Sequence, residues 1–124
     1  MENEQHPHFS NGKICYLEIP ALDITLSSRF YAAVFGWHIR TRDSGEIAFD
    51  DAVGEVSGTW VLGRKPATEE GFIIHIMVDS ISATLELLVA HGGEIIRPQE
   101  DISMAEKIAR FADPAGNILG LYQQ

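Results

Sequence analysis

Hydrophobic and polar positions along the chain form two similar series of predicted elements. Apolar residues alternate through 14–19 and 72–78, which is typical of strands with one buried face. Each run leads through a polar capping position (Asp23, Ser80) into apolar residues at helical spacing. Three more strand-like segments follow each predicted helix, at 37–41, 46–49 and 56–62 in the first half and at 94–97, 107–111 and 117–122 in the second.

The two halves also repeat each other in sequence. Without a gap, Phe49, Asp51, Gly54 and Gly58 align with Phe111, Asp113, Gly116 and Gly120. In an earlier block, Ala33, Gly36, Ile39 and Arg40 align in the same way with Ala90, Gly93, Ile96 and Arg97. Extra residues in the second half fall near 98–105. The repeat predicts an α+β fold of two βαβββ modules, at about 13–65 and 71–124.

The predicted domain organisation is simple. A chain of 124 residues suits one domain, and we assign it to residues 13–124. Residues 1–12 are mostly polar and are expected to form a flexible tail. The N-terminus has no basic start followed by an apolar run, and no stretch is long and apolar enough to cross a membrane. We therefore expect a soluble cytoplasmic protein that does not bind membranes.

Alternation within the strands assigns residues to two faces. In 72–78 we expect the even positions, Phe72 among them, to face the core, which leaves His75 and Met77 on the other face. In 14–19 we expect Cys15 in the core, and Tyr16 and Glu18 on the other face. By this counting, Tyr16 and His75 hold equivalent places. The closing strands are expected to direct four residues the same way: Gly58, Trp60, Gly120 and Tyr122.

Charge and cysteine content exclude several classes of protein. Nine Lys and Arg against eighteen Asp and Glu give a formal net charge of −9, which makes nucleic acid a poor partner. The same surplus of acid weakly favours a cationic ligand. A single cysteine, Cys15, allows no internal disulfide and no cysteine-based zinc site. Arg40 and Arg97 close equivalent strands and are interpreted as solvated charges, with anion binding as the weaker alternative.

Several motifs together resemble the vicinal oxygen chelate superfamily, which includes glyoxalase I, bleomycin-resistance proteins and extradiol dioxygenases. The motifs are Glu18-Ile19-Pro20, then Arg29-Phe30-Tyr31-x-x-Val34-Phe35-Gly36-Trp37, and Arg110-Phe111-x-Asp113-Pro114-x-Gly116-Asn117. They span about residues 13–123 and are similar to small glyoxalase-related proteins. The resemblance implies paired modules that form a curved mixed sheet around a cleft, with the helices outside. It also implies a homodimer.

The resemblance implies a divalent metal in the cleft, held by residues from the first and last strands of each module. Counted along this sequence, those places are Ile14, Gly58, Ile73 and Gly120. Neither Ile nor Gly offers a metal-binding side chain, so we expect no metal at the usual places. A displaced divalent metal stays open as an alternative, with His75, Glu18 and His38 as its candidate ligands.

Two functions remain open at this stage. The first is a homodimer that binds a small organic molecule in a cleft lined by Tyr16, Trp60, Met77, Met104 and Tyr122. The second is a glyoxalase-related lyase, isomerase or dioxygenase, which uses a displaced metal or His75 and Glu18 as acid–base groups. A structural or regulatory subunit is a third hypothesis, for which the sequence offers no positive sign.

Overall fold

The structure, a computed structural model, describes residues 8–124. Most of the predicted flexible tail, residues 1–7, therefore lies outside the described residues. Contacts between Cα atoms group the chain into two compact units, Met1–Arg64 and Lys65–Gln124. We call them the first and second modules. In the described part of the chain, neither helix is long and apolar enough to span a membrane.

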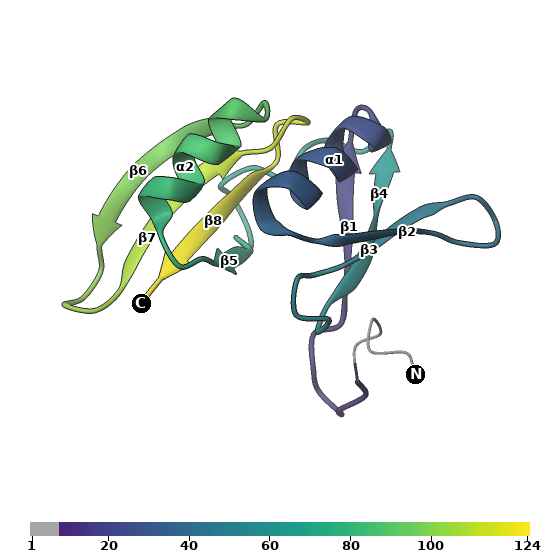
Figure 1. The fold of residues 1–124 in the computed structure, drawn as a ribbon, viewed down its shortest axis with the longest axis horizontal. Helices are drawn as coiled ribbons and strands as arrows, with labels where there is room; N and C mark the ends of the chain where they lie inside the picture. The colour runs from purple at the N-terminus through teal and green to yellow at the C-terminus, as the bar shows by residue number, and fades with distance from the viewer. Residues whose placement is uncertain (1–7) are drawn as a thin grey trace. The chain divides into compact units, whose positions relative to one another are not determined.

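The first module is a four-stranded sheet with one helix (Figure 1). The sheet order is β1-β4-β3-β2, with β1 parallel to β4 and the other neighbours antiparallel. Helix α1 contacts β2 and β4. The elements in chain order are β1 (Tyr16–Ala21), α1 (Ile24–Phe35), β2 (His38–Thr41), β3 (Ile47–Asp50) and β4 (Ser57–Leu62).

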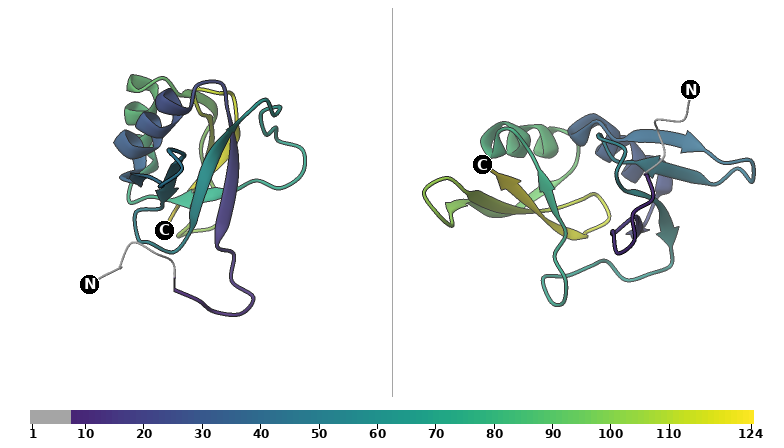
Figure 2. Two further views of the ribbon diagram at one scale, coloured as in Figure 1. Left: turned by 90° about the vertical axis from the view of Figure 1, so that its right-hand side faces the viewer. Right: turned by 90° about the horizontal axis from the view of Figure 1, so that it is seen from below.

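The second module repeats this topology. Its sheet order is β5-β8-β7-β6, again with the first and last strands parallel. Helix α2 lies along one face of the sheet and contacts β6, β7 and β8 (Figures 1 and 2). Its elements are β5 (His75–Met77), α2 (Ile81–Ala90), β6 (Glu94–Asp101), β7 (Lys107–Ala112) and β8 (Ile118–Gln123). The predicted α+β fold of two βαβββ modules is confirmed.

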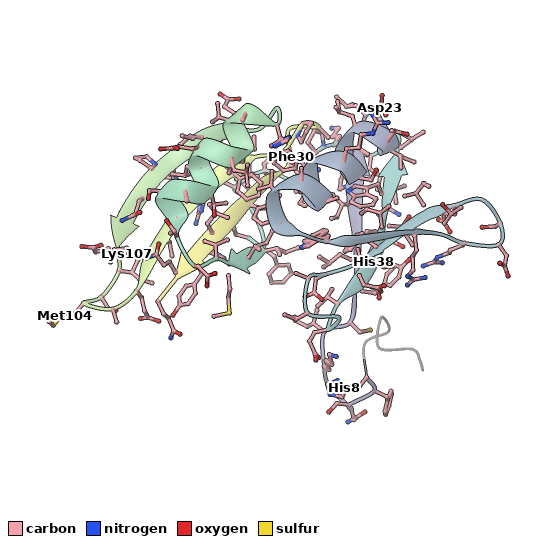
Figure 3. The ribbon with its side chains drawn as sticks, viewed as in Figure 1. His8, Asp23, Phe30, His38, Met104 and Lys107 are labelled. Atoms are coloured by element: carbon pink, nitrogen blue, oxygen red, sulfur yellow. The ribbon has the colours of Figure 1, made fainter. Side chains whose placement is uncertain are left out.

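The helices begin where the sequence predicts. The side chain of Asp23, at the start of α1 (Figure 3), accepts a hydrogen bond from Leu26 N at 3.0 Å. Ser80 does the same for Ala83 N at 3.1 Å. Gly36 ends α1 with φ 72°, a left-handed conformation in which a Cβ would be strained.

Each module has its own core between helix and sheet. In the first, Tyr31 of α1 stacks on Trp37 with ring centroids 4.5 Å apart, and Phe49 lies 4.5 Å from Trp37 and 4.8 Å from Trp60. Aromatic pairs at such spacing add to the free energy gained by burial. In the second, the buried residues are mainly aliphatic, and they include Ile81, Leu85, Leu88, Phe111, Leu119 and Leu121.

The closing strands of the two modules differ in register by one residue. Phe49 pairs with Gly58, whereas its repeat partner Phe111 pairs with Leu119. The turn before β4 is one residue longer than the turn before β8, and a one-residue shift moves every side chain to the opposite face. The prediction that all four closing-strand residues face the same way is therefore wrong: Gly58 and Trp60 face the helix, but Gly120 and Tyr122 do not.

The first strands begin later than predicted, which corrects three buried assignments. Cys15 precedes β1 and is exposed rather than part of the core. Strand β5 contains only His75–Met77, so Phe72 is fully exposed and Ile74 is 43% exposed. The apolar alternation continues past the strand ends into segments that no helix covers. Alternation therefore gave the faces of β5 correctly but not its length.

Candidate functional site

The sheet face turned away from the helix, which we call the helix-free face, carries the polar side chains of each module. In the second module, neighbouring strands place four residues in one row across this face. His75 pairs with Gly120, Gly120 with Arg110, and Arg110 with Arg97. Adjacent strands lie about 4.8 Å apart, so the row spans about 14 Å from β5 to β6. The row presents the imidazole of His75 at one end and two guanidinium groups at the other, with Gly120 between the imidazole and the guanidinium groups.

The imidazole of His75 lies directly over Gly120. A Cβ at Gly120 would approach His75 Cδ2 to 2.4 Å and Nε2 to 2.5 Å. The ring therefore occupies the space that a side chain at position 120 would need. His75 Nδ1 lies 3.3 Å from the Ile73 carbonyl oxygen. The tautomer in which Nδ1–H donates to that oxygen leaves Nε2 free to accept a proton.

Replacing Gly120 by alanine is expected to move the His75 ring off the sheet. The new Cβ meets an exposed side chain rather than backbone, so the cost in unfolding free energy should be about 1 kcal/mol or less. Loss of nuclear Overhauser contacts between the His75 ring and the backbone at 120 measures the movement. Retention of these contacts in the variant would contradict the close packing of ring on glycine.

The next row of the same face is more apolar. Met77 pairs with Tyr122, and Tyr122 pairs with Ile108. Met77 is 70% exposed and Tyr122 is half-buried. The Tyr122 hydroxyl donates a hydrogen bond to Glu106 Oε2. This bond lowers the pKa of Glu106 and raises the pKa of Tyr122 above its ordinary value.

The Tyr122–Glu106 bond gives a pH dependence with a defined window. Because the Tyr122 pKa is raised in the folded protein, the bond stabilises the fold below pH 10.0. This stabilisation is lost as the pH rises through the folded-state pKa of Tyr122. Because the Glu106 pKa is lowered in the folded protein, the same bond stabilises the fold above pH 4.5. This stabilisation is lost as the pH falls through the folded-state pKa of Glu106. Glu106→Gln should therefore bring the Tyr122 pKa down toward 10.0.

Phenolate absorbance during alkaline titration measures this shift, and subtraction of the Tyr122→Phe curve isolates the contribution of Tyr122 from the other tyrosines. An unchanged Tyr122 titration in Glu106→Gln would show that the bond does not persist in solution.

Two arginines of the first row share one carboxylate. Arg97 Nε and Arg110 Nη1 each lie 2.7 Å from Oε2 of Glu69, in the segment that precedes β5. The hydrogen bonds from Arg97 and Arg110 hold the pKa of Glu69 below its usual range, and Glu69 raises the pKa of Arg97. The carboxylate is therefore ionised at neutral pH. Arg97 was predicted to be a solvated strand-end charge, and the structure gives it an ion-pair partner.

The helix-free face of the first module has a corresponding row: Glu18, Thr59, Ala48 and Arg40. Glu18 lies opposite Thr59 as His75 lies opposite Gly120, so Glu18 is the structural counterpart of His75. The predicted equivalence of Tyr16 with His75 is therefore wrong by two residues, because β1 continues to Ala21, past its predicted end. Glu18 Oε1 lies 2.8 Å from Arg64 Nη1 on an exposed surface.

Tyr16 and Arg40 make the other polar contacts of this face. The Tyr16 hydroxyl accepts from Arg42 Nη2 at 2.9 Å, and the guanidinium carbon lies 5.9 Å from the ring centroid. Arg40 pairs with the buried carboxylate of Asp50, with Nε 3.0 Å from Oδ2, and the Asp50 hydrogen bond raises the pKa of Arg40. Ser57 donates to the same carboxylate. These contacts tie strands β1 to β4 together by side chains.

Two of the predicted cleft residues lie elsewhere. Trp60 is 2% exposed and packs against Tyr31 and Phe49, so it belongs to the core of the first module. Met104 is fully exposed in the loop between β6 and β7, away from either sheet face (Figure 3). Met77 and Tyr122 lie on the helix-free face of the second module, and Tyr16 lies on that of the first.

A separate cavity of about 420 Å³ adjoins Tyr16 in the first module. Its walls are residues 8–13 with Cys15, Tyr16 and Ser57. Lys13 Nζ holds this segment in place through Glu55 Oε1 at 2.6 Å and the His8 carbonyl at 3.2 Å. The hydrogen bond from Lys13 lowers the pKa of Glu55.

The residues at the family's metal-ligand places do not fit a divalent metal. With the register seen in the sheets, the places that correspond to Ile73 and Gly120 in the first module are Tyr16 and Thr59, not Ile14 and Gly58. None of these four residues is a carboxylate or an imidazole. Within residues 8–124 there is also no group of three or more His, Cys, Asp and Glu side chains with metal-binding geometry. His38 lies on β2, one row away from Glu18.

Sequence reasoning missed Arg110 and Glu69 as members of the site. Arg110 was visible only as part of a family motif, although its position one before the buried Phe111 places it on the helix-free face. Glu69 gave no signal, because it lies in a segment without periodicity whose path only the folded chain determines.

The sequence matches the family described as the Glyoxalase/Bleomycin resistance protein/Dioxygenase superfamily over residues 13–121. A Mycobacterium tuberculosis protein named "Putative glyoxylase CFP32" is 24% identical over 123 residues, which are 93% of this chain and 47% of that protein. The chain thus spans about half the length of this curated relative. A "Glyoxylase-like domain-containing protein" of Didymella fabae is 29% identical over 117 residues, 86% of this chain and 90% of the relative.

Solved structures share the fold at low sequence identity. A glyoxalase/bleomycin resistance protein/dioxygenase family enzyme from Burkholderia phytofirmans has a TM-score of 0.74 and 18% identity, covering 90% of this chain and 98% of that one. A glyoxalase-related enzyme from Fulvimarina pelagi has a TM-score of 0.71 and 20% identity, covering 91% and 88%.

Proposed function

Because this chain belongs to the Glyoxalase/Bleomycin resistance protein/Dioxygenase superfamily, we propose that it binds a small organic molecule on the helix-free face of its second module. The observation that carries the proposal is the row of His75, Gly120 and Arg110 beside the more apolar row of Met77 and Tyr122. Small-molecule sites combine a few convergent polar groups with apolar surface in this way. Glycine at position 120 lets the imidazole of His75 lie against the sheet, where its exposed edge is open to the molecule.

We propose further that binding does not use the family's metal. The support is the donor set, because Tyr16, Thr59, Ile73 and Gly120 stand where the family's ligands are expected. The imidazole of His75 also fills the space of a side chain at 120. The protein is also proposed to act as a homodimer, as the family resemblance implies. Analytical ultracentrifugation tests the dimer, and a monomer at micromolar concentration would contradict it.

A screen of small organic compounds, followed by NMR, tests the binding proposal. Amide and side-chain spectra of the labelled protein are recorded in the presence of chelator. Compounds that bind should shift the resonances of His75, Met77 and Tyr122 and raise the melting temperature. Met77→Ala, which removes exposed apolar surface, should weaken binding, whereas the exposed loop variant Met104→Ala should not. A screen in which every hit shifts only residues outside this face would overturn the proposal.

A second candidate is an enzyme of the glyoxalase-related lyase, isomerase or dioxygenase type. The observation that favours it is the exposed His75 imidazole, whose Nε2 is free to take a proton when Nδ1 donates to Ile73 O. Its test is turnover of α-ketoaldehyde–thiol adducts or catechols, with and without added Ni²⁺, Zn²⁺ or Fe²⁺. His75→Ala should abolish any turnover. No turnover under any of these conditions would contradict the candidate.

A further inference from the structure

A carboxylate of the chain itself occupies the arginine end of the row. Both contacts of Glu69 use the same oxygen, with Arg97 Nε and Arg110 Nη1 each 2.7 Å from Oε2. An arginine presents a planar fork of donors that suits both oxygens of a carboxylate, but Glu69 uses one oxygen for two forks. Arg110 Nε is buried and, within residues 8–124, has no hydrogen-bond partner. The pair therefore keeps donor capacity that Glu69 does not use.

The pairing of β6 with β7 is irregular on both sides of Arg97. The register shifts between Ile95 and Arg97 and again between Arg97 and Glu100. Such irregularities change the direction of a side chain relative to the regular ladder. Arg97 is nevertheless paired with Arg110, and two like charges directly opposite each other are unfavourable unless an anion lies between them. The sheet thus places two guanidinium groups where they require an anionic group.

Glu69 is not needed to hold its segment on the module. Two residues earlier, Ala67 N donates to Asn117 Oδ1 at 2.8 Å, and Ile118 N donates to the Ala67 carbonyl at 2.9 Å. Asn117 is buried and anchored by Asp113. The backbone at Ala67 would stay attached if the Glu69 side chain swung away, and Glu69 is itself about one-third exposed. Its carboxylate is therefore free to exchange with another.

We infer that the Arg97–Arg110 pair binds the carboxylate of a small-molecule ligand, and that Glu69 occupies this position until the ligand displaces it. The inference rests on the proposed function for the rest of the ligand. The neighbouring row of Tyr122 and Ile108 offers apolar surface, so the ligand is a carboxylate with an apolar body. His75 lies at the opposite end of the row, two strands from Arg110.

The overall charge of −9 does not oppose this assignment. Charges separated by more than about 10 Å are largely screened at ordinary salt, so the local charges decide. With Glu69 displaced, the two guanidinium groups face the ligand, and Glu100 is the acidic group that also acts on Arg97. The net acidity favoured a cationic ligand at the sequence level, whereas the arginine pair favours an anionic group at this position.

Glu69→Gln and Glu70→Gln provide a matched pair of variants for the test. Both remove one negative charge from neighbouring positions, but only Glu69 contacts the arginines. Benzoate is the probe, benzamide its uncharged counterpart and inorganic phosphate the alternative anion. Arginine Nε–H resonances of Arg97 and Arg110 report occupation of the pair. Benzoate should bind Glu69→Gln about tenfold more tightly than it binds either Glu70→Gln or the unmodified chain, because the competing carboxylate is removed.

Adding Arg110→Gln to the Glu69→Gln variant should abolish benzoate binding, and benzamide should bind neither variant measurably. Equal benzoate affinity in Glu69→Gln and Glu70→Gln would overturn the inference, as would equal binding of benzamide and benzoate. Phosphate that shifts the arginine resonances at the same concentration as benzoate would overturn the carboxylate assignment. If the inference fails in one of these ways but uncharged compounds still bind beside Met77, the proposed function stands without the inference. If no compound of any charge binds the helix-free face of the second module, the proposed function fails instead.

Discussion

Gly58→Ala is expected to destabilise the first module by about 3 kcal/mol or more, because the new Cβ has no space. It would lie 2.2 Å from the Leu17 carbonyl oxygen, which belongs to the backbone of the paired strand β1, and 2.5 Å from the Phe49 ring. Phe49 is fully buried between Trp37 and Trp60 and cannot rotate away. Relief therefore requires β1 and β4 to separate.

Urea denaturation followed by tryptophan fluorescence measures this effect, since both tryptophans, Trp37 and Trp60, lie in the first module, and circular dichroism of the same samples reports on both modules. The matched control is Gly120→Ala, which makes the same change in the closing strand of the other module but displaces only the exposed His75 ring. A Gly58→Ala protein with an unchanged unfolding midpoint would show that the register of β4 against β1 is incorrect.

Asp113→Ala is expected to destabilise the second module by about 2–4 kcal/mol, because it leaves several buried donors without acceptors. Asp113 Oδ1 accepts from Ala115 N at 2.9 Å and Asn117 N at 3.0 Å, and Oδ2 accepts from Asn117 Nδ2 at 2.9 Å. Asn117 in turn holds Ala67 N at 2.8 Å. The loss should therefore also release the segment that carries Glu69.

Thermal unfolding followed by circular dichroism measures the stability, and faster hydrogen exchange at the Ala67 amide measures the release. The repeat supplies a control in Asp51→Ala, because Asp51 accepts from Glu55 N and Val56 N in the corresponding turn but is only half-buried. Its cost should be about 1 kcal/mol. Equal costs for the two variants would contradict the assignment of a buried anchoring role to Asp113.

The architecture could be predicted from the sequence because each element has a local cause. Asp23 and Ser80 cap the helices, and Gly36 ends α1 in the left-handed conformation. The aligned glycines and aspartates of the two halves predicted the repeat of one βαβββ unit. These signals depend on residues close together in the chain, which a single sequence displays directly.

The site could be predicted only in part, because its geometry depends on the pairing of distant segments. One additional residue in the turn before β4 moved Trp60 into the core. Strand β1 continues to Ala21, past its predicted end, which makes Glu18, not Tyr16, the counterpart of His75. Alternation alone does not reveal such a shift, since the apolar pattern continues on either face. Glu69 reaches the arginines through a segment that has no periodic pattern at all.

The acidic composition illustrates the same difference between sequence and site. A net charge of −9 describes the solvated surface as a whole, and it excluded nucleic acid as a partner class at the sequence level. The second module, however, concentrates two arginines and a histidine in one row of its helix-free face. The proposed recognition depends on this local arrangement, which the charge total does not describe.

The central claim is that the helix-free face of the second module recognises its ligand with its own side chains and without the family's divalent metal. Elemental analysis tests this claim most directly. The protein is purified without chelator, equilibrated with Ni²⁺, Zn²⁺ and Fe²⁺, and freed of unbound ions before the measurement. We predict no divalent metal in stoichiometric amount. A stoichiometric metal whose binding is lost in His75→Ala or Glu18→Gln would contradict the account.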